Sequence, residues 1–247
     1  MILIITACIK PYDSVENLAV KENNIRLEQY MDSLKFYIHQ EKITDIIFCD
    51  NSNCEGIDEQ LLINEAINEG KTLEILKFKM NEQLVCKKGK SYGELCIMDY
   101  IFSNSELIKK HDYFVKVTGR LKVENINKIL ECISNQYNYF VFLGNPVNAK
   151  SKKIDTRFYG MKYQDYFEIK KTLEQTVDES NDITLEQGFF TSLKENKILF
   201  KMIPFYPRIT GVSGSTGIDY GKMRFKSIKY ITKDILVMLW NFCTRWR

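Results

Sequence analysis

The sequence predicts an α/β fold: a doubly wound (Rossmann-like), mixed and mostly parallel sheet flanked by helices, with a C-terminal amphipathic helix. Three observations support this. Short apolar runs rich in β-branched residues alternate with segments of helical periodicity through the first half of the chain. The length of 247 residues fits one large domain, and 45% hydrophobic residues suffice for a sizeable core. Glycines and prolines cluster only late, between residues 204 and 221.

Each element follows from the spacing of apolar residues. Strands are predicted at residues 2–8, 43–49, 72–78 and 113–117, and helices at 27–38, 57–68 and 93–107. The second half is less regular, with a strand at 139–143, a polar loop at 144–155 and helices at 161–176 and 185–195. This order predicts βαβ units. We expect residues 1–221 to form one ligand-binding domain and residues 222–247 to form a separate basic helix.

Charge is unevenly distributed along the chain. The formal net charge is +3, but residues 222–247 hold seven basic residues and one acidic residue, so the preceding part is slightly acidic. A near-neutral body argues against nucleic-acid binding. The seven cysteines lie mostly in apolar stretches, which is typical of buried free thiols in a reducing compartment. No apolar run approaches the roughly 18 residues of a membrane span, and the opening MILIIT is too short for a signal peptide, so a cytoplasmic location is expected.

The basic C-terminal segment has a pattern of its own. Six apolar residues recur at helical spacing among lysines and arginines: Ile228, Ile231, Ile235, Met238, Leu239 and Phe242. Such a helix suits the interface of an anionic membrane. We expect residues 225–247 to make a peripheral contact with the inner face of the cytoplasmic membrane. Packing against the domain and a dimer contact are the alternatives.

Polar residues just past the strands are the candidate ligand contacts, because open α/β sheets bind ligands at the carboxyl ends of their strands. Thr6 follows the first strand and Asp50 the second. The stretch KKGKSYGE at residues 87–94 precedes a predicted helix, and its ammonium groups and backbone donors suit a diphosphate. It is not a Walker A loop, because the first glycine is missing. The structural alternatives are an ordinary turn after Asp50 and a solvated loop with Ser91 as a helix cap.

The strand at 113–117 is the most informative, because it ends in Thr118-Gly119-Arg120 and delivers an arginine to the cleft. The run YFVKVTGR, preceded by KGKSYGE and followed by DTRFYG at 155–160, resembles GT-A glycosyltransferases of bacterial capsule and lipopolysaccharide assembly over about residues 1–220. The resemblance implies a GT-A fold and transfer from a nucleotide sugar, with a UDP-sugar favoured, to a hydroxyl of a surface glycan or lipid-linked oligosaccharide. It also implies a row of contacts: Thr6 and Asp50 at the nucleoside, Lys90 and Glu94 at the donor, Arg120 at the diphosphate and Asp155 at a sugar.

The sequence departs from this resemblance at the metal site. Most GT-A enzymes hold Mn²⁺ or Mg²⁺ with an Asp-x-Asp motif after the fourth strand, and the chain contains no such motif. Arginine presents a planar fork of donors that matches phosphate oxygens in pairs, so Arg120, with Arg208, is expected to replace the metal. No cofactor is therefore expected, although Mn²⁺ or Mg²⁺ stays open. The alternative role for Arg120 is a salt bridge to a carboxylate.

Sugar transfer also requires a base that takes the proton of the acceptor hydroxyl, and we favour inversion at the anomeric carbon. Glu186 and Asp155 are the candidates. For Glu186, stabilisation by the helix dipole is the alternative. The loop 207–217 is expected to close over the donor and to supply Ser213 and Ser215, unless it is a plain surface loop. Two other functions stay open: a catalytically silent partner subunit with this fold, and a sugar nucleotidyltransferase, which the missing glycines after the first strand disfavour.

Overall fold

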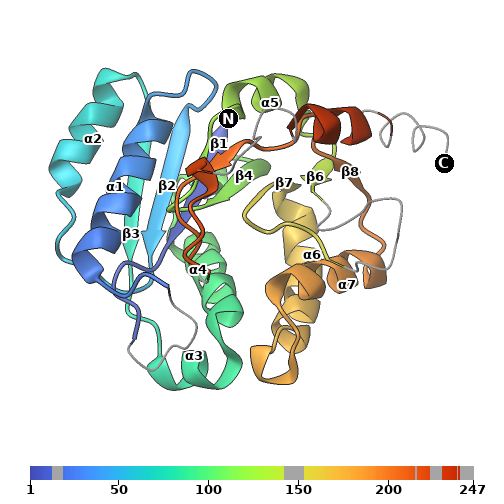
Figure 1. Ribbon diagram of the computed structural model, residues 1–247. Coiled ribbons are helices and arrows are strands. Elements are labelled where there is room, and N and C mark those ends of the chain that lie inside the picture. Colours follow the sequence, from blue (N-terminus) through green and yellow to red (C-terminus); the bar gives the residue numbers. More distant parts are fainter. Residues whose placement is uncertain (13–18, 142–152, 215, 223–229, 238, 240–247) are drawn as a thin grey trace.

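The computed structural model describes residues 1–12, 19–141, 153–214, 216–222, 230–237 and 239. In these residues a seven-stranded sheet has the order β3-β2-β1-β4-β7-β6-β8, and β5 pairs with β9 (Figure 1). The strands are β1 (Ile2–Ala7), β2 (Asp45–Asp50), β3 (Thr72–Lys77), β4 (Tyr113–Thr118), β5 (Lys122–Val123), β6 (Asn138–Phe140), β7 (Phe158–Lys162), β8 (Phe200–Met202) and β9 (Ile209–Thr210). Strands β1 to β4 run parallel, whereas β7 is antiparallel to β4 and β6. The predicted mixed, mostly parallel α/β fold is confirmed.

Helices cover both faces of the sheet. On one face lie α1 (Asn23–Ile38), α2 (Glu59–Asn68) and α5 (Ile126–Cys132). On the other lie α4 (Lys90–Asn104), α6 (Tyr163–Thr176) and α7 (Leu185–Glu195), with the short α3 (Glu82–Lys88) before α4. Because strand residues alternate in direction, Leu3 and Ile5 join the core under α1 while Ile2 and Ile4 join the core under α4.

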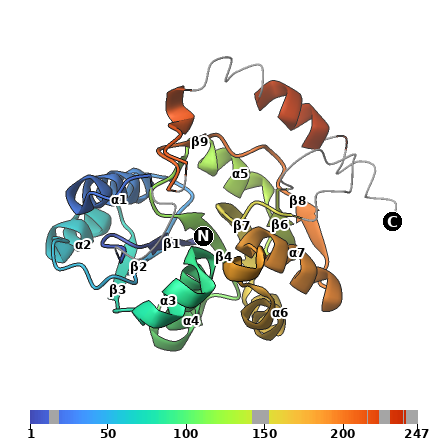
Figure 2. The same cartoon turned by 60° about the horizontal axis from the view of Figure 1, so that its bottom comes forward.

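A further helix covers residues 230–237 and is held to the domain by one face. The backbone N–H of Tyr206 donates to Asp234 Oδ1 at 2.7 Å, and Val237 is buried. Figure 2 shows this helix at the periphery, far from α2 and α3. The predicted domain boundary at residue 221 adjoins residues 223–229, which lie outside the described part, so the division stays a prediction.

Two parts of the chain differ from the sequence prediction. Residues 158–162 form β7, where a helix was expected to begin at 161. In this strand Gly160 leaves room for the Tyr113 hydroxyl of β4, which occupies the space that a Cβ would need. Residues 87–94 do not form a loop, because α3 runs to Lys88, Gly89 breaks the chain direction at φ +84°, and α4 starts at Lys90. The strand predicted at 139–143 corresponds to β6 at 138–140, whereas most of the loop predicted at 144–155 lies outside the described part.

The described cysteines are all free thiols, as predicted, but they are only partly buried. Cys49 and Cys54 lie in the core, whereas Cys86 and Cys132 are exposed. Among the described residues, no helix is long and apolar enough to cross a lipid bilayer.

Candidate active site

The strand order places a topological switch point between β1 and β4. The chain leaves β1 towards β2 on one side and returns on the other side with β4, and this is where open α/β sheets bind ligands. Thr6 and Thr118 are partners in this parallel pair, so both strands end at the same edge. A cavity of about 460 Å³ opens there.

Residues from distant parts of the sequence meet in the wall of this cavity. Seven of the predicted site residues line it: Thr6, Lys90, Glu94, Thr118, Arg120, Glu186 and Ser213. They belong to β1, α4, β4 and the turn after it, α7 and the loop after β9. Three other predicted residues do not line the cavity: Asp50, Asp155 and Arg208. Ser215 lies outside the described residues.

Asp50 organises the loop after β1. Its buried carboxylate accepts hydrogen bonds from the backbone N–H groups of Ile9 and Cys54, both at 2.9 Å. The Ser52 hydroxyl contacts both carboxylate oxygens, at 2.9 and 2.8 Å. Protein groups thus occupy both oxygens, and Asp50 shapes the wall behind the cavity.

Asp155 and Arg208 are also paired with other residues of the chain. The Asp155 carboxylate is bound in bidentate fashion by Arg157, with Nε to Oδ1 at 2.8 Å and Nη2 to Oδ2 at 2.6 Å. Arg208 Nη2 lies 4.0 Å from Asp234 Oδ2. Arg157 itself lines the cavity, and it was not among the predicted site residues although it stands in the DTRFYG motif.

Arg120 is a buried cation, and the described part of the chain gives it no counter-ion. The residue is 7% exposed, its Nη1 donates to Gln29 Oε1 at 3.3 Å, and its guanidinium carbon lies 5.7 Å from the centre of the Tyr30 ring. Its Nε has no hydrogen-bond partner in the part of the chain that the structure describes. Burial lowers the pKa of Arg120 below its usual value, an effect that Tyr30 opposes and Arg26 increases. No carboxylate among the described residues forms an ion pair with Arg120, so the predicted alternative of a salt bridge is not found there.

Gly119 brings Arg120 to this place. Its N–H donates to the Thr6 carbonyl at 2.9 Å, which folds the turn after β4 back over the end of β1. A Cβ at this position would lie 2.6 Å from that carbonyl oxygen and 3.0 Å from Tyr30 Cδ1. Only glycine therefore fits the close approach of the two strand ends.

The start of α4 differs from the expected phosphate site. The Glu179 carboxylate accepts hydrogen bonds from the N–H groups of Lys90 and Ser91, at 3.0 and 3.3 Å, and from the Ser91 hydroxyl at 2.5 Å. The backbone donors that we expected to cradle a diphosphate are therefore occupied by a side chain. Lys90 is still one of the residues that line the cavity.

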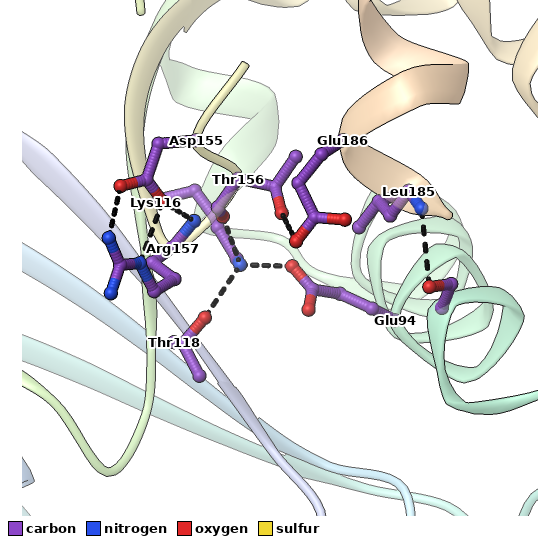
Figure 3. A network of polar contacts seen from close by, with 9 residues as sticks. Glu94, Lys116, Thr118, Asp155, Thr156, Arg157, Leu185 and Glu186 are labelled. Carbon is purple, nitrogen blue, oxygen red and sulfur yellow. Dashed lines mark hydrogen bonds and ion pairs between the residues drawn. The ribbon is translucent and has the colours of Figure 1, made fainter. Parts of the chain in front are cut away.

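A polar network connects β4, α4 and α7 beside the cavity (Figure 3). Lys116 is fully buried and forms an ion pair with Glu94. Its Nζ also donates to Thr118 Oγ1 at 3.2 Å and to the Thr156 carbonyl at 2.9 Å. The Thr156 hydroxyl donates to Glu186 Oε1 at 3.4 Å. The sequence analysis missed Lys116; its one signal was a lysine inside the apolar strand YFVKV.

Glu186 stands in the first turn of α7, but another residue caps this helix. The side chain of Gln187 accepts a hydrogen bond from the Thr184 N–H at 2.9 Å, which is part of a capping box. The Glu186 carboxylate contacts the Thr156 hydroxyl and lines the cavity. It is therefore available to a ligand.

The residues after β4 do not fit a divalent metal. Thr118 offers a hydroxyl and Arg120 a cation, whereas Mg²⁺ and Mn²⁺ are bound through carboxylates. Glu94, a carboxylate of the same wall, is already paired with Lys116. In the described part of the chain, no three His, Cys, Asp or Glu side chains are grouped to share a metal ion.

The fold of this chain is similar to that of a solved glycosyltransferase. The crystal structure of the apo-form glycosyltransferase GlyE from Streptococcus pneumoniae TIGR4 is similar to this chain, with a TM-score of 0.51 and 10% sequence identity over 79% of this chain and 43% of that one. A second GlyE crystal structure has a TM-score of 0.48, with 9% identity over 81% and 44% of the two chains. The chain thus spans less than half the length of GlyE, and likeness at this identity concerns the fold alone. No protein-family model and no curated protein matches the sequence.

Proposed function

We propose that this chain is a glycosyltransferase that moves a sugar from a nucleotide-sugar donor to a hydroxyl group, with inversion and without a divalent metal. The observation that carries the proposal is Arg120, a buried guanidinium at the switch-point cavity that has no counter-ion among the described residues. A nucleoside diphosphate gains negative charge as its bond to the sugar breaks. A fixed guanidinium neutralises that charge and binds phosphate oxygens in pairs.

Glu186 acts as the base in this proposal. It takes the proton of the acceptor hydroxyl while that oxygen forms a bond to the anomeric carbon. The bond from the anomeric carbon to the diphosphate breaks at the same time, and the nucleoside diphosphate leaves with the electron pair. Of the two carboxylates considered from the sequence, Glu186 lines the cavity, whereas the Asp155 carboxylate is bound by Arg157.

The donor is proposed to be a UDP-sugar, and the acceptor a growing glycan of capsule or lipopolysaccharide type. The cavity volume is in the range of small-molecule sites. For the acceptor, the support comes from the C-terminal helix. Ile231, Ile235 and Leu239 are 56%, 49% and 55% exposed, while Asp234 and Val237 face the domain. An outward apolar face in a basic segment supports contact with an anionic membrane, where a lipid-linked acceptor resides.

The donor assignment is tested by thermal shift of the purified protein against UDP-, GDP-, CMP- and dTDP-sugars, each with Mn²⁺ and with EDTA. We expect one donor to raise Tm by several degrees in both conditions, because a ligand that binds only the folded state stabilises it. No response to any donor would favour the silent-subunit alternative. Release of pyrophosphate from a nucleoside triphosphate and a sugar phosphate would identify a nucleotidyltransferase instead.

The membrane contact is tested with a triple variant, Ile231→Ser, Ile235→Ser and Leu239→Ser, which leaves the Asp234 contact intact. Sedimentation with vesicles of phosphatidylglycerol and phosphatidylcholine should fall by at least about tenfold, because the apolar face no longer enters the interface. Ile67→Ser is the matched control, since Ile67 is 61% exposed on α2. Equal sedimentation of the triple variant and the control would reject the membrane contact.

A further inference from the structure

We propose that Lys116 is a positioning residue that holds the carboxylates of Glu94 and Glu186 in place for the reaction. The inference rests on the proposed function, because Glu186 is its base. The evidence is the set of contacts that Lys116 makes with residues of α4, β4 and the segment before β7 (Figure 3).

Lys116 occupies a position where the fold calls for an apolar side chain. In β4 the alternating residues Phe114, Lys116 and Thr118 share one face, and Phe114 belongs to the core under α4. Lys116 has no exposed surface. A buried ammonium group lowers stability unless it is paired and hydrogen-bonded, so this residue requires its partners.

The ammonium group has no hydrogen-bond donor left for a ligand. It carries three N–H groups, and three oxygens surround it: a Glu94 carboxylate oxygen, the Thr118 hydroxyl and the Thr156 carbonyl. Arg120, by contrast, has an Nε that no described residue contacts by a hydrogen bond. We therefore assign ligand contact to Arg120 and the placement of neighbouring groups to Lys116.

Through these contacts Lys116 connects two carboxylates of the same cavity. Glu94 is bound directly. Glu186 is reached through Thr156, whose carbonyl accepts from Lys116 and whose hydroxyl donates to Glu186 Oε1. The N–H of Leu185 also donates to the Ser91 hydroxyl at 3.2 Å, which ties the start of α7 to α4. Loss of the ammonium group should release both carboxylates, which lowers kcat and changes the donor KM little.

The test compares four proteins: wild type, Glu94→Gln, Lys116→Met, and the double variant Lys116→Met/Glu94→Gln. Each is measured for Tm and for the kcat and KM of donor hydrolysis, with the nucleotide sugar that stabilises the wild type most and water as the acceptor. Lys116→Met alone should lower Tm by roughly 10 °C, because it leaves Glu94 without its cation. Lys122→Met is the control, since Lys122 pairs with Asp32 outside the cavity.

The decisive comparison is between Glu94→Gln and the double variant. Glu94→Gln leaves a buried ammonium without its carboxylate, so removal of Lys116 from that background should raise Tm. Relative to Glu94→Gln, the double variant should also have a kcat at least tenfold lower and a KM within about threefold. A purely structural lysine would move Tm and kcat upward together, and that result would overturn the inference. Absence of donor turnover in the wild type would instead overturn the proposed function and this inference with it.

Discussion

Replacement of Arg120 by methionine should leave the unliganded protein at least as stable as the wild type while it removes most of the turnover. Arg120 is buried, its pKa is lowered, and no carboxylate of the described ranges pairs with it. The guanidinium is therefore unfavourable for folding at any pH at which it is charged, because burial lowers its pKa below that of the unfolded chain. The methionine side chain fills the space of the aliphatic stem without the charge.

The magnitude follows from the contacts of Arg120. The variant loses a hydrogen bond to Gln29 and a cation–π contact with Tyr30, about 1 kcal/mol each. In return, the variant no longer buries an unpaired charge, which removes a desolvation cost of several kcal/mol. We expect Tm to stay equal or to rise by up to about 10 °C. Loss of one charge partner of the leaving group should lower kcat by about 10²- to 10³-fold.

The assay is Tm by differential scanning fluorimetry together with release of nucleoside diphosphate from the donor. Arg157→Met is the matched control, because this variant leaves the buried Asp155 carboxylate without its partner and should lower Tm. The two arginine variants should therefore differ in the direction of their effect on Tm. A drop in Tm for Arg120→Met comparable to that of the control, or turnover within about threefold of wild type, would refute the reasoning.

Three further predictions follow from single side chains. Glu186→Gln should lower kcat by at least about 10²-fold and leave donor affinity within about threefold of wild type. Glu195→Gln, in the exposed last turn of α7, is the control and should have no effect. Equal kcat values for the two variants would exclude Glu186 as the base. Gly119→Ala should lower Tm by roughly 4–12 °C, since its Cβ would lie 2.6 Å from the Thr6 carbonyl oxygen, and an unchanged melting curve would contradict that packing. Burial raises the pKa of Asp99 to about 6, against the attraction of Lys170. Because the folded state then binds the proton more tightly than the unfolded state, the Tm of Asp99→Asn relative to wild type should increase as pH rises from about 4 to about 6. A Tm difference that stays constant over this range would exclude the raised pKa.

The sequence allowed the sheet to be predicted because its signal is local. The runs at 2–8 and 113–117 are apolar and β-branched, and parallel strands must place their carboxyl ends at one edge. Thr6, Thr118 and Arg120 could therefore be assigned to a common site. The register of β1 against β4, which pairs Thr6 with Thr118, satisfies that expectation.

The parts that could not be predicted depend on partners far away in the chain. Glu179 occupies the N–H groups of α4 from 89 residues away, and Lys116 is bound by a carbonyl 40 residues later. In β7, Gly160 accommodates the hydroxyl of Tyr113, a residue 47 positions earlier in the chain. No local pattern carries such information, because each residue alone has the composition of an ordinary loop, strand or helix.

The central claim, that Arg120 rather than a divalent metal neutralises the leaving group, is tested most directly by the effect of EDTA on turnover. Nucleoside diphosphate release by the wild-type protein is measured in EDTA and in Mn²⁺ with the donor that the thermal-shift panel selects. We predict rates within about twofold of each other, because the guanidinium supplies the positive charge in both conditions. Turnover that disappears in EDTA and returns with Mn²⁺ would contradict the claim.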